Sequence, residues 1–228
     1  MRDDTTTCWT LIQGAVAGNP ADRGRFARRY GAVARAYLAA RWRGTAFLTE
    51  LDDAVQEVFL ECFREGGLLD RLDPGRPGGF RAFLYGVIRN VALRVERRHA
   101  RQREVRALSD LHDVASQEES LSRILDRAWA RALVRHAADE LSARATEATV
   151  DARKRVELLR LRFFEGLSIQ EIAASWGVEA AHLHHEYARA RREFHEALLA
   201  VVAFHHPEST PGEVEREALS LLQLLQES

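Results

Sequence analysis

Cysteine and long apolar runs are scarce in this chain of 228 residues. Its two cysteines, Cys8 and Cys62, are too few for a disulfide framework or a thiol-rich metal site, so the sequence fits a reducing compartment. No apolar run approaches the roughly 20 residues that cross a bilayer, and no apolar core follows a basic leader at the start. We therefore expect a cytoplasmic protein with no membrane partner.

Motifs for catalysis and for cofactors are also missing. The chain has no glycine-rich phosphate loop, no nucleophile elbow and no convincing pair of carboxylates. Six histidines lie between residues 182 and 206, but no cysteine pair or His-Glu-x-x-His pattern accompanies them, and the adjacent His184 and His185 project to different sides of a helix. The sequence predicts no enzyme, no cofactor and no metal site.

Charge is balanced overall but unevenly distributed. Up to Ala107 the chain has 19 basic and 13 acidic side chains, and after it 14 basic and 21 acidic ones. The two halves are therefore expected to face different partners. Lys154 is the only lysine, a bias that can reflect genome composition, so an arginine is not by itself a sign of phosphate binding.

Apolar residues recur with helical spacing through most of the chain, which predicts an all-α fold. In the first half we expect helices over residues 8–17, 20–42, 50–65 and 80–106. Thr49 and Asp52 have the spacing of a capping box for the third helix. Residues 70–79 contain two prolines and three glycines, so they are expected to form a loop.

The helix expected over residues 80–106 combines an apolar stripe with a basic surface. The stripe runs from Phe80 to Val95 in three- and four-residue steps and should be buried. Eight arginines and only two acids make the remaining surface strongly positive, which suits a phosphate backbone. A solvated basic face on an ordinary core helix is the alternative interpretation.

In the second half, residues 108–120 lose the apolar period and are the best linker candidate. Helices are expected over residues 120–141, 156–164, 169–176 and 179–202, with a weakly patterned stretch at 143–152. Gly177 between the third and fourth of these is typical of a helix-turn-helix. After Pro207, Thr210 to Glu213 can cap a final amphipathic helix, whose expected role is to cover an apolar patch on this chain.

The run from Asp52 to Leu60, the loop, and the run from Phe80 to Ala92 with its arginine-rich end resemble conserved region two of bacterial RNA polymerase sigma factors. They are most similar to the small extracytoplasmic-function type. The resemblance implies a surface that binds the polymerase clamp helices; a solvated acidic face is the alternative. The implied polymerase-binding residues are Asp52, Asp53, Gln56 and Glu57.

The same resemblance implies that the loop and the basic helix capture unpaired bases of the minus-ten promoter element. Aromatic rings can stack on such bases, and cations can follow the backbone. The family usually has tryptophan where this chain has Phe83. The implied contacts are Arg76, Phe80, Arg81, Asn90, Arg94, Arg97, Arg98 and Arg101.

The segment from Phe163 to Ala173, followed by Arg189 to Arg192, resembles region four of the same family. This implies that the second helix of the helix-turn-helix binds the major groove of the minus-thirty-five element. Family members usually have lysine or arginine at the positions of His184 and Glu186, and Glu186 would repel a phosphate unless it accepts a hydrogen bond from a cytosine amine. The implied contacts are Ser168, His182, His184, His185, Arg189, Arg191 and Arg192.

We therefore expect two small helical domains: residues 1–107 resembling region two, a linker at 108–120, and residues 121–206 resembling region four, with a C-terminal extension at 207–228. The expected function is that of a sigma factor that binds core RNA polymerase, recognises promoter DNA and promotes strand opening. An anti-sigma inhibitor would be a further partner, for which the final helix is a candidate site. The alternatives are a stand-alone helix-turn-helix regulator and a sigma-like interaction protein with weakened DNA binding.

Overall fold

The computed structural model describes residues 8–64, 79–103 and 114–226. Within these ranges the chain forms α-helices, one 3-10 helix and no strand, which confirms the all-α prediction. The chain divides into two compact units. The first unit comprises Met1–Ala132, Phe204–Ser209 and Leu219–Ser228, and the second comprises Leu133–Ala203 and Thr210–Ala218. The domain limits expected from the sequence stay a prediction.

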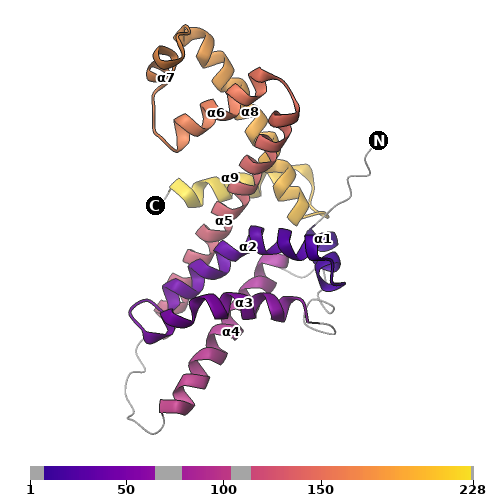
Figure 1. Cartoon of the computed structure of the whole chain (residues 1–228), viewed down its shortest axis with the longest axis vertical. Helices are drawn as coiled ribbons and strands as arrows, with labels where there is room; N and C mark the ends of the chain where they lie inside the picture. Colours follow the sequence, from indigo (N-terminus) through magenta and orange to yellow (C-terminus); the bar gives the residue numbers. More distant parts are fainter. Residues whose placement is uncertain (1–7, 65–78, 104–113, 227–228) are drawn as a thin grey trace. The chain divides into compact units, whose positions relative to one another are not determined.

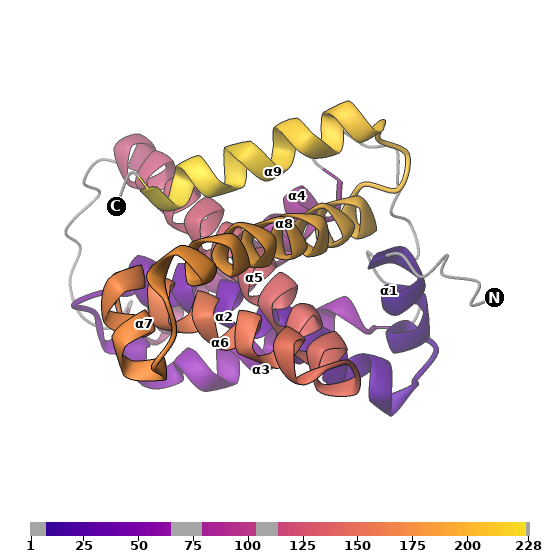
Figure 2. The same ribbon diagram turned by 90° about the horizontal axis from the view of Figure 1, so that it is seen from above.

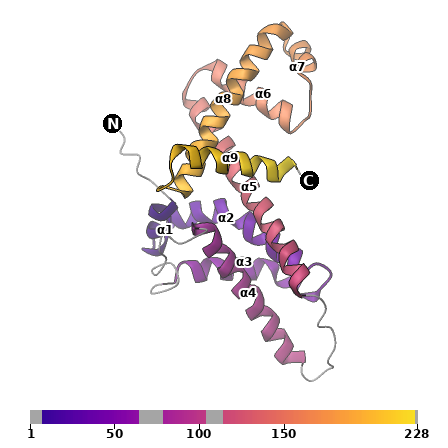
Figure 3. The ribbon, with the colours of Figure 1, turned by 180° about the vertical axis from the view of Figure 1, so that it is seen from behind.

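Four helices and a 3-10 turn form most of the first unit. They are α1 (Cys8–Val16), α2 (Pro20–Arg41), η1 (Ala46–Glu50), α3 (Leu51–Cys62) and α4 (Gly79–Arg103). α2 packs against α1, α3 and α4, and α3 also packs against α4. Figures 1 and 3 both show α3 alongside α2, with α4 crossing α3. Asn19 begins α2 because its side chain accepts the backbone N–H groups of Ala21 and Asp22.

Buried aromatic rings form the centre of the first unit. Tyr30 of α2 stacks on Trp129 of α5 (Val114–Glu147), with 5.7 Å between ring centroids. The ring centroid of Phe80 of α4 lies 4.9 Å from that of Tyr30, and Phe80 is only 2% exposed. The Tyr30 hydroxyl lies 2.9 Å from Nε2 of His205, the last residue of α8 (Ala180–His205). The apolar stripe predicted for α4 is therefore the core stripe of this unit.

A polar contact joins the end of α2 to α4. Glu96 of α4 accepts the Arg41 Nε and Nη2 donors at 2.7 and 3.0 Å, and the Trp42 indole N–H at 2.9 Å. Because the contact is bidentate and partly buried, it fixes the orientation of α4 better than a surface ion pair would.

The start of α3 differs from the sequence prediction. The Thr49 hydroxyl donates to the Ala46 carbonyl instead of capping α3, and Glu50 at the N-cap makes no side-chain cap bond. Thr45 instead caps η1 by accepting the Phe47 N–H. The expected capping box is therefore wrong, because the chain enters α3 through a 3-10 turn that already uses these residues.

The second unit contains the later part of α5, α6 (Val150–Phe163), α7 (Ile169–Trp176), most of α8 and the first part of α9 (Pro211–Gln226). Leu158, Ile172 and Leu183 contribute to a core shared by α6, α7 and α8. Gly177 has φ 65°, a left-handed conformation that glycine adopts without a steric cost. Figure 2 shows the short α7 beside the first turns of α8. The predicted helix-turn-helix is present.

Three helices extend beyond their expected limits by three residues or more; one of them, α6, begins at Val150, six residues before its expected start. α5 begins at Val114, so residues 114–120 of the expected linker are helical, while residues 108–113 lie outside the described ranges. α8 continues to His205, three residues past the expected end. Over the described ranges no helix is both long and apolar enough to span a bilayer.

Candidate nucleic-acid and protein interfaces

An exposed polar face lies on α3. Asp52, Asp53 and Gln56 are exposed, and the Asp52 carboxylate pairs with Arg35 of α2. Leu60, one turn beyond Gln56, is 64% exposed and adds an apolar side chain to this face. The face therefore offers carboxylate, amide and apolar groups to a partner.

The Glu57 side chain contacts α4 and is only partly exposed to solvent. Its Oε1 accepts from Arg94 Nη1 at 2.8 Å, and its Oε2 accepts from Arg98 Nη2 at 3.1 Å. Glu61, one turn along α3, accepts from the same Arg94 nitrogen at 2.7 Å. One ion-pair network therefore joins a residue expected to bind polymerase to two residues expected to bind DNA.

This network also affects the pKa of Arg94. Its hydrogen bond to Glu61, with a further contribution from Glu57, raises the pKa of the Arg94 guanidinium. The Arg94 and Arg98 side chains are nevertheless 46% and 57% exposed. They remain open to an additional anion.

The other residues implied for minus-ten binding lie in different environments. Arg97 and Asn90 are exposed on α4, and within the described ranges Arg97 makes no ion pair with a carboxylate. Arg81 is half-buried and pairs with Asp126 of α5. Arg76 and the Arg101 side chain lie outside the described part of the chain, as does nearly all of the expected loop.

Phe80 requires a correction. Its ring is enclosed by aromatic neighbours, including Trp9 at 6.2 Å and Phe26 at 5.8 Å between centroids. At 2% exposure the ring has no open face for a base, so Phe80 belongs to the core. Phe83 is half-buried beside it, at 6.0 Å between centroids. The apolar period along α4 predicted that Phe80 is buried, and this is correct. Its position beside the arginines suggested contact with DNA, and this is wrong.

The helix-turn-helix presents its predicted residues on two elements. Ser168 caps α7: its hydroxyl accepts the Glu171 N–H, and the Glu171 carboxylate accepts the Ser168 N–H at 2.7 Å. His182, His184 and His185 are exposed on the first turns of α8. These turns are the part of a recognition helix that reaches base edges in proteins of this motif.

Three arginines follow further along α8. Arg189 Nε pairs with Glu193 at 3.2 Å, and the Arg191 guanidinium lies over the Tyr187 ring at 5.9 Å from its centroid. Arg192 is exposed. The exposed arginines of α8 therefore differ: Arg189 is partly neutralised by Glu193 on the same helix, whereas Arg191 and Arg192 are exposed cations.

A buried arginine explains Glu186, which the resemblance alone left unexplained. Arg155 of α6 is 7% exposed. Its Nε donates to Glu193 at 2.9 Å, and its Nη1 to Glu186 at 3.4 Å. The hydrogen bond to Glu193, followed by the contribution of Glu186, raises the pKa of Arg155. A buried cation needs such partners, so Glu186 acts inside the unit.

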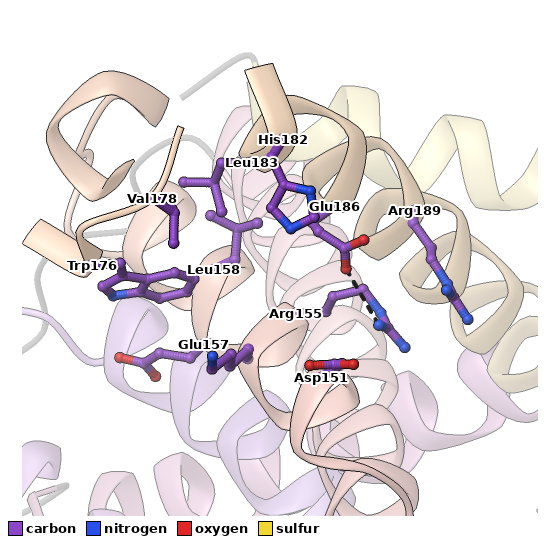
Figure 4. Close-up of a pocket in the computed structure, with 11 residues that line it drawn as sticks. Asp151, Arg155, Glu157, Leu158, Trp176, Val178, His182, Leu183, Glu186 and Arg189 are labelled. Carbon is purple, nitrogen blue, oxygen red and sulfur yellow. Dashed lines mark hydrogen bonds and ion pairs between the residues drawn. The ribbon is translucent and has the colours of Figure 1, made fainter. Parts of the chain in front are cut away.

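A hollow of about 530 Å³ lies beside this ion triad in the second unit. Figure 4 shows Trp176 and His182 on its wall, with Arg155 reaching Glu186 across the gap between α6 and α8. Both acidic and basic side chains line it, so the lining favours no single charge of ligand.

Comparison with known protein families gives a match for part of the chain. Residues 25–102 match the family model for Sigma-70 region 2. The match spans α2, α3 and α4 up to Gln102.

Among solved structures, the chain is similar to one described as CnrH in complex with the cytosolic domain of CnrY. The identity is 21%, and the alignment covers 84% of this chain and 97% of that one, with a TM-score of 0.32. So low a score carries no argument about this protein. No curated protein matches the chain.

Two features of these surfaces were missed by sequence reasoning. The pairing of Glu57 and Glu61 with α4 depends on how α3 packs, and no local pattern reports it. Arg155 did carry a signal, because it shares the helical face of Leu158 and Leu159. A lone arginine on an apolar face indicates a buried ion pair.

Proposed function

We propose that this protein is a sigma factor that binds core RNA polymerase, recognises promoter DNA and promotes strand opening. The observation that carries the proposal is the match of residues 25–102 to Sigma-70 region 2. The all-α fold and the helix-turn-helix that follows this region also support it.

Polymerase binding is assigned to the exposed face of α3. Asp52, Asp53 and Gln56 offer acceptors to a basic partner surface, and Leu60 adds an apolar contact beside them. Charged groups at an interface set the rate and orientation of docking more than its strength, whereas a central apolar side chain contributes to strength. Glu57 lies at the edge of this face and belongs to the same proposal.

Minus-ten binding is assigned to α4 without Phe80. Asn90 and Arg97 are exposed, and Arg94 and Arg98 keep about half of their side-chain surface open. Arg81, Arg76 and Arg101 remain members of the proposed set on the resemblance alone. Contacts from arginine to phosphate fix the register of the strand, and the bases are read by other groups.

Minus-thirty-five binding is assigned to the start of α8, with Ser168 at the cap of α7. His182, His184 and His185 supply donors and acceptors for base edges, and Arg189, Arg191 and Arg192 supply contacts to phosphate. Because Glu186 is held by Arg155, it is not aimed at the DNA backbone as a free carboxylate. This pairing removes one objection to DNA binding by α8.

A sigma-like interaction protein with weakened DNA binding is the second candidate. The pairing of Arg94 and Arg98 with acids of α3 favours it, because two cations of the proposed DNA surface are already engaged. An anti-sigma inhibitor remains a proposed partner, with the exposed side of α9 as its candidate site.

One experiment separates the candidates. The purified chain is added to core RNA polymerase with sheared genomic DNA from the source organism, and specific transcript starts are mapped. The proposal predicts new starts that share a common upstream sequence. Co-purification with polymerase without new starts would favour the interaction protein, and duplex binding without polymerase would favour a stand-alone regulator.

A further inference from the structure

The first turns of α8 carry a cluster of three exposed histidines, His182, His184 and His185. Before Arg189, this helix contains no lysine or arginine. Histidine therefore supplies the only basic side chains in the part of α8 that is proposed to reach base edges. Histidine changes its charge between about pH 5 and pH 8, so the charge of this surface depends on pH.

The three imidazoles have no partner that would fix their protonation state. Within the described ranges, none of them forms an ion pair or a hydrogen bond with another side chain. Histidines elsewhere in the chain do have acidic partners: His99 pairs with Glu50, and His195, further along α8, lies 3.3 Å from Glu215. The imidazoles at the start of α8 are therefore open to an incoming ligand.

The fixed charges around the histidine cluster nearly cancel. The hollow beside α8 is lined by His182 together with acids and cations of α6, as Figure 4 shows in part. The charged groups on α6, α7 and the start of α8 are Asp151, Lys154, Arg155, Glu157, Arg162, Glu171, Glu179, Glu186 and Arg189. Carboxylate, ammonium and guanidinium groups ordinarily keep their charge between about pH 6 and pH 8. The imidazoles therefore decide the sign of the charge that this surface presents.

We propose that DNA binding by the helix-turn-helix depends on pH: protonated His182, His184 and His185 bind the phosphates of duplex DNA, and the neutral imidazoles bind them weakly. The inference rests on the proposed function, in which the start of α8 lies against promoter DNA. An imidazolium donates from both ring nitrogens, whereas neutral imidazole has one donor and one acceptor. Hydrogen bonds from a charged donor to phosphate are about twice as strong as neutral ones.

The direction of the pH dependence follows from proton uptake. Since protonation favours DNA binding, DNA binding favours protonation to the same extent. The DNA-bound chain therefore holds more protons than the free chain, so affinity is highest at low pH and is lost as pH rises. A chain that binds DNA mainly through arginine would show no such loss over this range.

The expected size of the effect follows from the number of new contacts. An exposed ion pair contributes about 1.4-fold to 5-fold in affinity, so three together should make binding at least about threefold tighter at about pH 6 than at about pH 8. Each further phosphate neutralised on a duplex steepens the slope of log affinity against log salt by about 0.9. We expect the slope to be steeper by at least about 0.9 at the lower pH.

The test is a fluorescence-anisotropy titration of the full chain with a short DNA duplex of mixed sequence, at about pH 6 and about pH 8 and over a range of salt. The triple variant His182→Gln, His184→Gln, His185→Gln keeps polar side chains that cannot become charged, so it should lose the pH difference. His184→Arg adds a permanent cation and should bind more tightly than wild type at the higher pH. His206→Gln, beyond the end of α8, is the matched control and should keep the wild-type difference.

Circular dichroism at both pH values checks that each variant is folded. If the triple variant unfolds, His184→Gln alone replaces it and should show a smaller pH difference than wild type. Equal affinity and equal slope at the two pH values, in a chain that binds the duplex, would overturn the inference. A full pH difference in the folded glutamine variant would overturn it as well.

The outcome is separable from the proposed function. Failure to bind the duplex at either pH would overturn both this inference and the assignment of minus-thirty-five binding to α8. A chain that initiates transcription but binds the duplex equally at both pH values refutes only this inference. A chain with the expected pH dependence that never initiates with polymerase refutes only the proposed function.

Discussion

At the scale of single residues, Arg155 links α6 to α8 within the second unit. It is 7% exposed and bonds two acids of α8. Its removal takes from Glu186 its buried cation and leaves Glu193 with Arg189 alone, and a broken buried pair costs about 3–5 kcal/mol. Because these two side chains are 29% and 28% exposed, water offsets part of that cost.

We predict that Arg155→Ala lowers the free energy of unfolding by about 2 kcal/mol in a urea titration. Hydrogen exchange should localise the loss to α6 and α8. Arg160→Ala is the matched control, because Arg160 is half-exposed and pairs only along and just beyond its own helix. A similar loss in both variants would contradict the role assigned to Arg155.

Cys62 gives a second prediction at this scale. Burial, followed by repulsion from Glu61, raises the pKa of the thiol to about 12. In a Cys8→Ser chain the remaining thiol should react with a disulfide reagent at about pH 8 only after unfolding, because the thiolate is the nucleophile. Rapid reaction of the folded chain would show that Cys62 is accessible.

The same shift has a consequence for stability at high pH. The unfolded thiol ionises near its ordinary pKa of about 8.5, whereas the folded thiol stays protonated up to about 12. Between these values the folded state binds more protons, so stability should fall as pH rises, by up to about 1.4 kcal/mol per pH unit relative to Cys62→Ala. Below about pH 8 the two chains should show the same pH dependence.

At the scale of elements, α9 contains two leucines in opposite environments. Leu221 is 1% exposed and Leu219 is 50% exposed. We predict that Leu221→Ala lowers the free energy of unfolding by about 3 kcal/mol, because it deletes buried methyl groups and leaves a cavity. Leu219→Ala should change it by less than about 0.5 kcal/mol. Equal effects would mean that α9 does not pack in solution as the structure has it.

Ser168 tests whether the start of α7 acts as a helix cap, a DNA contact or both. Ser168→Ala removes the acceptor for the Glu171 N–H and should cost about 1 kcal/mol of stability. Ser168→Asp keeps an acceptor and should preserve stability, but it places a negative charge at a residue proposed to contact promoter DNA. If Ser168→Asp binds promoter DNA as tightly as wild type, Ser168 is a cap alone.

The helices could be predicted from the sequence because their apolar periods are strong. The stripe from Leu84 to Val95 is buried as expected, and the limits of α7 match the prediction. Errors arose where two local rules compete: Thr49 has the spacing of a cap, but the 3-10 turn before α3 uses its hydroxyl. Phe80 is likewise buried, as the apolar period of its helix predicts, although the arginines near it in the sequence suggested contact with DNA.

The candidate surfaces were less predictable because they depend on packing between helices. Exposure of Asp53, Gln56 and Asn90 follows from their place off the apolar stripes. That Glu57 pairs with Arg94 follows from how α3 packs against α4, which no spacing along the chain reports. His205 is a similar case, since its buried contact is with a residue 175 positions away.

At the scale of the whole molecule, the account joins a protein-binding face on α3 to a basic helix that lies beside it. The ion pairs of Glu57 with Arg94 and Arg98 connect the two proposed surfaces. The helix-turn-helix in the second unit is proposed as a separate contact to duplex DNA.

The most direct test of this account is permanganate reactivity of thymines on a promoter fragment selected by the transcript-mapping experiment. With core polymerase and the wild-type chain, thymines in the minus-ten segment should become reactive, because they are unpaired. Arg97→Ala together with Asn90→Ala should reduce that reactivity while polymerase binding persists. Thymines that stay unreactive with a polymerase-bound wild-type chain would contradict the claim that this protein opens promoter DNA.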